Sequence, residues 1–168
     1  MRRSLIALVV LLFPIVLLAG DGSVKGTFTV NGKSYPFKYV YAWRAPNDFH
    51  EERIDTYVLL SDQAVPAESR GDFFGRSELA EKGKLNGILV DFNPDGEIVS
   101  GNVYCEQFKD KGGQFSASGM HQWDKKKLTD KIVEGKLYTS KPDDFFETRW
   151  EYTATFSAPV VTVKKSKK

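Results

Sequence analysis

Residues 148–159 read TRWEYTATFSAP, and this stretch decides the class of fold. Every second side chain is apolar, from Trp150 through Tyr152 to Phe156, whereas those between them are polar or charged. Successive side chains of a β-strand point to opposite faces of a sheet. The pattern therefore predicts a strand with one face against a core and the other against water.

Runs of the same kind recur along the chain. We predict strands over residues 24–30, 34–45, 54–61, 84–93, 97–108, 114–123, 128–139 and 148–159. Most connections are short, and Asn31-Gly32 is a strong hairpin signal because both central residues of a type I′ turn need positive φ. Short turns join antiparallel neighbours. The sequence thus predicts an all-β protein: a single antiparallel β-sandwich or barrel of about eight strands.

One segment interrupts the strands. Residues 77–82 read SELAEK, and Gly83 follows them. Serine is a favoured N-cap, and glycine commonly ends a helix. We therefore expect one short helical insertion that begins at Ser77 and ends before Gly83.

The N-terminus has the pattern of an export signal. Two arginines precede an apolar run over residues 5–18, and two small residues follow it. This run is shorter than the ~20 apolar residues that span a bilayer. We predict a signal peptide over residues 1–20, a single β domain over residues 21–160 and a basic tail over residues 161–168. The mature protein is then periplasmic or extracellular and is not an integral membrane protein.

Charge and cysteine content exclude further classes. The chain has 24 Lys+Arg and 22 Asp+Glu, but two arginines lie in the leader and four lysines in the last five residues. The predicted domain is therefore acidic, which excludes nucleic acid as a partner. A single cysteine, Cys105, rules out an intrachain disulfide framework. It shares a strand face with Val103, so we expect its thiol to be buried.

Aromatic side chains on the alternating faces are candidates for ligand binding, because they can stack on rings or line an apolar cavity. If the domain were a barrel with an open interior, its lining would be Tyr39, Tyr41, Phe115, His121, Trp123, Trp150 and Tyr152. The alternative interpretation is that these large side chains simply fill the core of a small β domain. Histidine in such a place is commonly a satisfied core residue.

Residues 91–98, DFNPDGEI, resemble the first half of an EF-hand calcium loop, with oxygen ligands at Asp91, Asn93 and Asp95. The twelfth position is Asn102 rather than the bidentate glutamate of that motif. The same residues also form a good hairpin turn, because proline presets φ and glycine adopts positive φ. The turn is the favoured interpretation.

Catalytic patterns are weak. Asp48, His50 and Glu51 form a loop cluster that could supply metal ligands or an acid–base pair. The sequence has no Gly-x-Ser-x-Gly elbow, phosphate-binding glycine loop, His-Glu-x-x-His motif or Cys-x-x-Cys pair. We therefore assign no catalytic residue and no cofactor.

These observations favour an exported, non-enzymatic β domain. It would act as a binding or envelope-associated interaction module whose partner is a protein, an envelope component or a small apolar ligand. The alternative is a lipocalin-like barrel that carries a small apolar ligand. The fold class alone does not decide between them.

Overall fold

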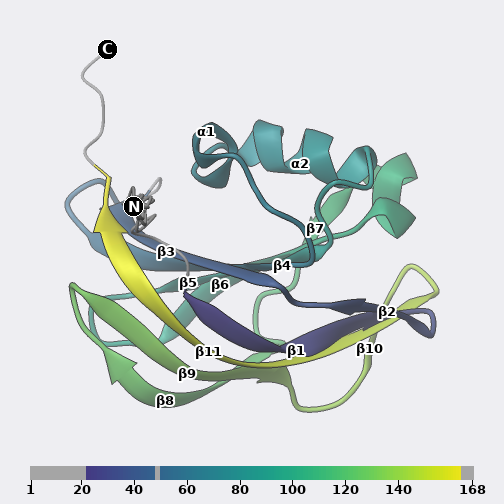
Figure 1. The fold of residues 1–168 in the computed structure, drawn as a ribbon. Helices are drawn as coiled ribbons and strands as arrows, with labels where there is room; N and C mark the ends of the chain where they lie inside the picture. The colour runs from purple at the N-terminus through teal and green to yellow at the C-terminus, as the bar shows by residue number, and fades with distance from the viewer. Residues whose placement is uncertain (1–21, 48–49, 164–168) are drawn as a thin grey trace, which may run out of the picture.

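The computed structural model describes residues 22–47 and 50–163, and most of them lie in strands (Figure 1). The strands are β1 (Ser23–Val30), β2 (Lys33–Pro36), β3 (Tyr39–Pro46), β4 (Ile54–Ser61), β5 (Gly87–Phe92), β6 (Ile98–Tyr104), β7 (Gln114–Ser116), β8 (His121–Leu128), β9 (Ile132–Thr139), β10 (Asp143–Phe145) and β11 (Thr148–Thr162). The helices are α1 (Ala67–Arg70), α2 (Phe73–Glu81) and the 3₁₀ helix η1 (Glu106–Lys111). The predicted signal peptide and the last five residues of the predicted tail lie outside the described residues. In the part described, no helix is both long enough and apolar enough to span a membrane.

The long strand β11 joins the two halves of the molecule. It pairs antiparallel with β1 over residues 150–157 and with β9 over residues 153–159. Its last residues, Val160–Thr162, instead pair with β3, and this pairing is parallel. The sequence had predicted that residues 148–159 form a strand, and the structure confirms this and extends it to Thr162.

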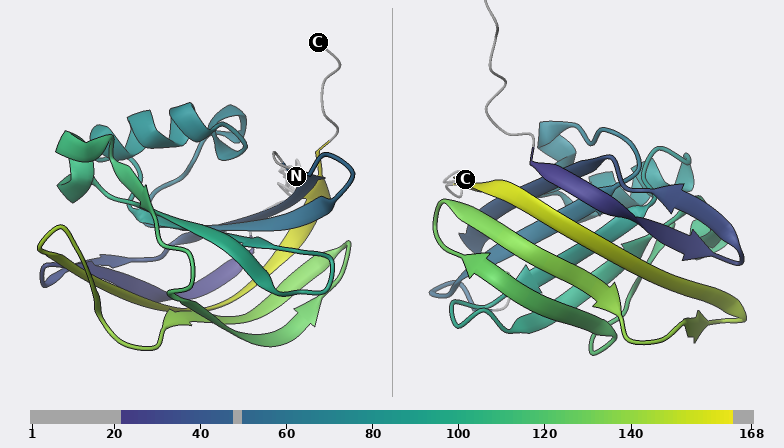
Figure 2. Two further views of the ribbon diagram at one scale, coloured as in Figure 1. Left: turned by 180° about the vertical axis from the view of Figure 1, so that it is seen from behind. Right: turned by 60° about the horizontal axis from the view of Figure 1, so that its bottom comes forward.

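The strands form one large open sheet. Its order is β2-β1-β11-β3-β4-β5-β6-β7, while β9 and β10 also pair with β11, and β8 pairs with β9. The sheet folds over so that β1, β8, β9 and β11 face β3 to β6 (Figures 1 and 2). The described residues thus contain eleven strands rather than about eight. The expectation of a wholly antiparallel sheet is corrected by the β11–β3 pair, and that of a closed barrel by the open sheet.

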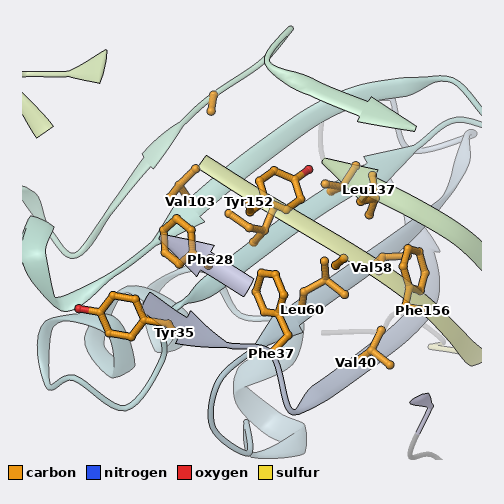
Figure 3. Close-up of a cluster of buried hydrophobic side chains, with 14 of the residues drawn as sticks. Phe28, Tyr35, Phe37, Val40, Val58, Leu60, Val103, Leu137, Tyr152 and Phe156 are labelled. Atoms are coloured by element: carbon orange, nitrogen blue, oxygen red, sulfur yellow. The ribbon is translucent and has the colours of Figure 1, made fainter. Parts of the chain in front are cut away.

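The main core fills the space between the two halves. Figure 3 shows side chains from both halves pointing toward one another, with Phe28, Tyr152 and Phe156 opposite Val58 and Leu60. The largest fully buried side chain is that of Trp150, which lies in β11. Burying side chains of this size supplies about 2–3 kcal/mol each relative to leaving them exposed, so this layer carries much of the stability.

A second, smaller apolar cluster lies on the other face of β3, β4 and β5. It includes Tyr41, Trp43, Leu59 and Leu89 from the sheet, and Ala80 from α2 packs against them. The helices α1 and α2 cover part of this outer face (Figure 1). The part of the sheet formed by β3, β4 and β5 is therefore apolar on both faces.

The helical insertion begins earlier than predicted. The helix α2 starts at Phe73, and the side chain of Asp72 caps it by accepting a hydrogen bond from the backbone N–H of Phe74 at 3.1 Å. A second helix, α1, precedes it. The predicted N-cap, Ser77, lies inside α2 and donates its hydroxyl to the carbonyl of Phe73.

Two predicted strands are each divided between the halves. Residues 34–45 form the end of β2 and most of β3, with Phe37 and Lys38 between them. Residues 114–123 form β7, which pairs with β6, and the start of β8, which pairs with β9. The period of two continues through each break, so the sequence pattern gives no sign of the crossing.

Candidate functional site

The seven aromatic and histidine residues predicted to line an interior lie on two different faces. Five belong to the main core or pack against it: Phe115, His121, Trp123, Trp150 and Tyr152. The other two, Tyr39 and Tyr41, point to the outer cluster beneath the helices. The structure therefore does not bring all seven together.

The inner group is packed as a core. Nδ1 of His121 lies 2.8 Å from the hydroxyl of Tyr152, and Nε2 is buried with no hydrogen-bond partner among the residues described. Burial lowers the pKa of His121 to about 4 and raises that of Tyr152. A charged imidazole is disfavoured here because burial removes it from water, and no described acid offsets that cost. The arrangement fits a neutral core histidine better than a proton donor.

The three residues of the calcium-like motif have different surroundings. Asp91 is buried on β5, whereas Asp95 is exposed. Asn93 accepts a hydrogen bond from the backbone N–H of Glu97 at 2.9 Å, and Gly96 has φ of 82°. Within the described ranges, no three or more His, Cys, Asp or Glu residues gather closely enough to hold a metal ion.

The loop cluster at residues 48–51 is only partly described. Asp48 lies outside the described residues, and both His50 and Glu51 are exposed. The backbone N–H of His50 donates to Asn47 Oδ1 at 3.0 Å. This contact fixes the loop rather than aiming the imidazole at a partner.

A groove with a volume of about 600 Å³ lies on the outer face of strands β3, β4 and β5. The strands β3, β4 and β5 form one wall with Tyr41, Trp43, Tyr57 and Leu89, and the helical segment and the end of β11 form the others. Figure 1 shows α1 and α2 lying over this part of the sheet. Small-molecule sites commonly have volumes of 300–1,000 Å³. The groove therefore has the size of a ligand site.

The sheet side of the groove is an aromatic wall. Trp43 and Tyr57 are directly opposite each other on β3 and β4. Their rings stack with centroids 5.5 Å apart and planes 12° apart. Cross-strand aromatic pairs of this kind stabilise the sheet, and both rings contribute apolar lining to the groove.

Two arginines from the helical segment line the opposite side. The guanidinium of Arg70 lies 3.8 Å from the ring centroid of Tyr41, and its Nε donates to the carbonyl of Val65 at 2.9 Å. Arg76 is only 5% exposed. Its Nε donates to the hydroxyl of Tyr104 at 2.9 Å, and its Nη1 donates to the carbonyl of Arg70.

A buried pair of carboxyl groups lies farther along the same face. Asp55 is fully buried, accepts two hydrogen bonds of 2.8 Å from Arg53 and one of 2.6 Å from Asn47. Asp91 is opposite Tyr57 in the β4–β5 register. Burial and the neighbouring charge of Asp55 raise the pKa of Asp91 to about 7.

Comparison of the chain with protein-family models, with curated protein sequences and with solved structures finds no match. The chemistry of the site must therefore be argued from its own residues.

Two groups of residues on this face differ in their surroundings. The groove offers an aromatic wall and positive charge, while Asp55 is hydrogen bonded to Arg53 and Asn47. Sequence reasoning missed Asp55, Arg70 and Arg76. Asp55 had a signal, because it is the one charged residue in the predicted strand 54–61. The two arginines had none, since charged residues on a short helix are ordinarily solvated.

Proposed function

We propose that the protein is an exported, non-enzymatic binding module whose ligand site is the outer groove. The export pattern of the first 20 residues supports a periplasmic or extracellular location. The ligand class we propose is a small molecule with a flat apolar ring system. On this proposal the two facing halves of the sheet act as a sandwich-like scaffold, and a carrier role would use the groove instead of a barrel interior.

The observation that carries the proposal is the stacked pair of Trp43 and Tyr57 on the wall of the groove. A flat ring entering the groove buries apolar surface against two rings that are already ordered. Little side-chain entropy is lost, because the two rings constrain each other before the ligand arrives. Leu89 extends the apolar surface on the third strand.

Binding can be tested with N-phenyl-1-naphthylamine, a neutral two-part aromatic probe whose fluorescence rises in apolar sites. We expect saturable binding by the purified protein. Tyr57→Ala should weaken it about tenfold, because one ring of the wall is lost, equivalent to ~1.4 kcal/mol. Tyr57 is only half-buried, so this variant should still fold, which circular dichroism would verify.

The matched control is Phe146→Ala. Phe146 is 71% exposed and is not part of the groove lining. Its removal should leave the dissociation constant unchanged. Absence of saturable binding, or an equal loss in both variants, would contradict the proposed site.

A further inference from the structure

The groove contains positive charge that no acidic side chain of the described residues pairs with. Arg76 is almost completely buried, and both of its protein acceptors are uncharged: the hydroxyl of Tyr104 and the carbonyl of Arg70. Arg70 likewise bonds to a carbonyl, that of Val65. Among the residues that the structure describes, neither arginine forms an ion pair.

Burial without a counter-charge is unusual for arginine. Its guanidinium stays charged in proteins, and buried charges are generally paired because desolvation is costly. Asp55, a buried carboxylate on this face of the sheet, has such a partner in Arg53. Glu68 also lines the groove, but its side chain is exposed and takes no ion pair within the described chain. The buried arginine therefore has room for an external anion.

The geometry leaves one donor of Arg76 available. Its hydrogen bonds use Nε and Nη1, while Nη2 takes no acceptor from the described residues. That nitrogen is not among the fully buried unpartnered atoms, and Arg76 is part of the groove lining. Nη2 therefore keeps some exposed surface on a residue that lines the groove. A charge-assisted hydrogen bond formed there is stronger than one between neutral groups.

We propose that the ligand of the groove is a small organic acid. Its flat apolar ring packs against Trp43 and Tyr57, and its carboxylate or sulfonate accepts from Arg76. The inference rests on the proposed function and deepens it, because the aromatic wall sets the shape of the ligand and the arginine sets its charge. Arg70, held over Tyr41, adds positive potential at the same side of the groove.

Two probes with the same rings separate charge from shape. The anion 8-anilinonaphthalene-1-sulfonate differs from N-phenyl-1-naphthylamine by its sulfonate group. We expect the sulfonate probe to bind at least tenfold more tightly to the unaltered protein. Arg76→Met keeps a long side chain but removes the charge. This substitution should raise the dissociation constant of the sulfonate probe at least tenfold and change that of the neutral probe less than about twofold.

Lys84→Met is the matched control. It also removes one positive charge next to the helical segment, but Lys84 is exposed and does not line the groove. Both dissociation constants should stay within about twofold. If Arg76→Met does not fold, Arg70→Gln replaces it, since Arg70 is less buried. Arg70→Gln is then expected to lower the affinity for the sulfonate probe several-fold and to leave that for the neutral probe nearly unchanged.

The outcomes distinguish the two proposals. If neither probe binds saturably, the proposed function fails. If the neutral probe binds through Tyr57 but the sulfonate gives no gain, the groove is a ligand site and the acid inference is overturned. The inference is also overturned if Arg76→Met weakens both probes equally, or if Lys84→Met weakens the sulfonate probe as much as Arg76→Met does.

Discussion

At the scale of single residues, Gly101 packs directly against the imidazole of His121 in the main core. A Cβ built on Gly101 would lie 2.1 Å from Nε2 of His121, well inside van der Waals contact. The imidazole cannot easily move away, because its Nδ1 is hydrogen bonded to Tyr152 and the ring is buried. Glycine is therefore required at position 101 by the histidine rather than by its backbone.

We expect Gly101→Ala to lower the free energy of unfolding by about 2–3 kcal/mol, as overpacking of a core does. The double variant with His121→Ala should lose at least ~1 kcal/mol less stability than the two single losses added together, because the clash is gone. Gly71→Ala is the control, since a Cβ there meets nothing within 4 Å. Urea unfolding of the four variants measures the coupling, and strict additivity would contradict this account.

Local rules predicted the residues whose surroundings are local. Asn31 and Gly32 have φ of 47° and 77°, as the hairpin signal required, because that signal depends only on the turn itself. Cys105 is buried as expected from its strand face. Arg76 could not be found in this way, because its burial depends on where α2 lies relative to β6.

At the scale of elements, the helix α2 shows how a start signal can be misplaced. Asp72 supplies the N-cap, but Phe73, Phe74 and Gly75 follow it and do not resemble a first helical turn. Gly83 does end the segment with φ of 67°, as predicted. The end of the helix could be predicted because glycine is the usual residue at the left-handed position that follows a helix.

The cap can be tested by replacing each candidate in turn. Asp72→Ala should lower the free energy of unfolding by about 1 kcal/mol, because the backbone N–H of Phe74 loses its acceptor. Ser77→Ala should change it by only a few tenths, because Ser77 lies within the helix, where alanine is the better helix former. Denaturant titrations of both variants compare the two. A larger loss at Ser77 would place the cap there after all.

At the scale of the whole molecule, the sequence predicted an all-β class but not how the sheet folds over. The stripe of aromatics from Tyr35 to Trp43 keeps its period of two. Tyr35 faces the main core and Trp43 faces the helices, because the chain passes from one half to the other between them. The parallel pairing of β11 with β3 joins residues more than a hundred positions apart. Neither feature has a local signature.

The two buried titrating groups give the whole molecule opposing responses to pH. Burial and the charge of Asp55 raise the pKa of Asp91 from its ordinary value of 3.8 to about 7, so its stabilising contribution is complete below pH 4 and is lost as pH rises to about 7. His121 has a pKa of about 4 against 6.5, so its contribution is complete above pH 6.5 and is lost as pH falls to about 4. Between these limits the two dependences largely cancel.

We therefore expect the free energy of unfolding of the unaltered protein to change little between pH 4.5 and 6.5. Asp91→Asn leaves only the histidine, so its stability should fall by roughly 1 kcal/mol for each pH unit toward acid. His121→Gln leaves only the carboxyl group, so its stability should rise toward acid by a similar amount. The slope, rather than the absolute stability, is the measured quantity, which makes any packing cost of either substitution irrelevant. Exposed acids such as Glu78 contribute equally to all three proteins. Parallel slopes in the three proteins would mean that neither buried group titrates as its surroundings imply.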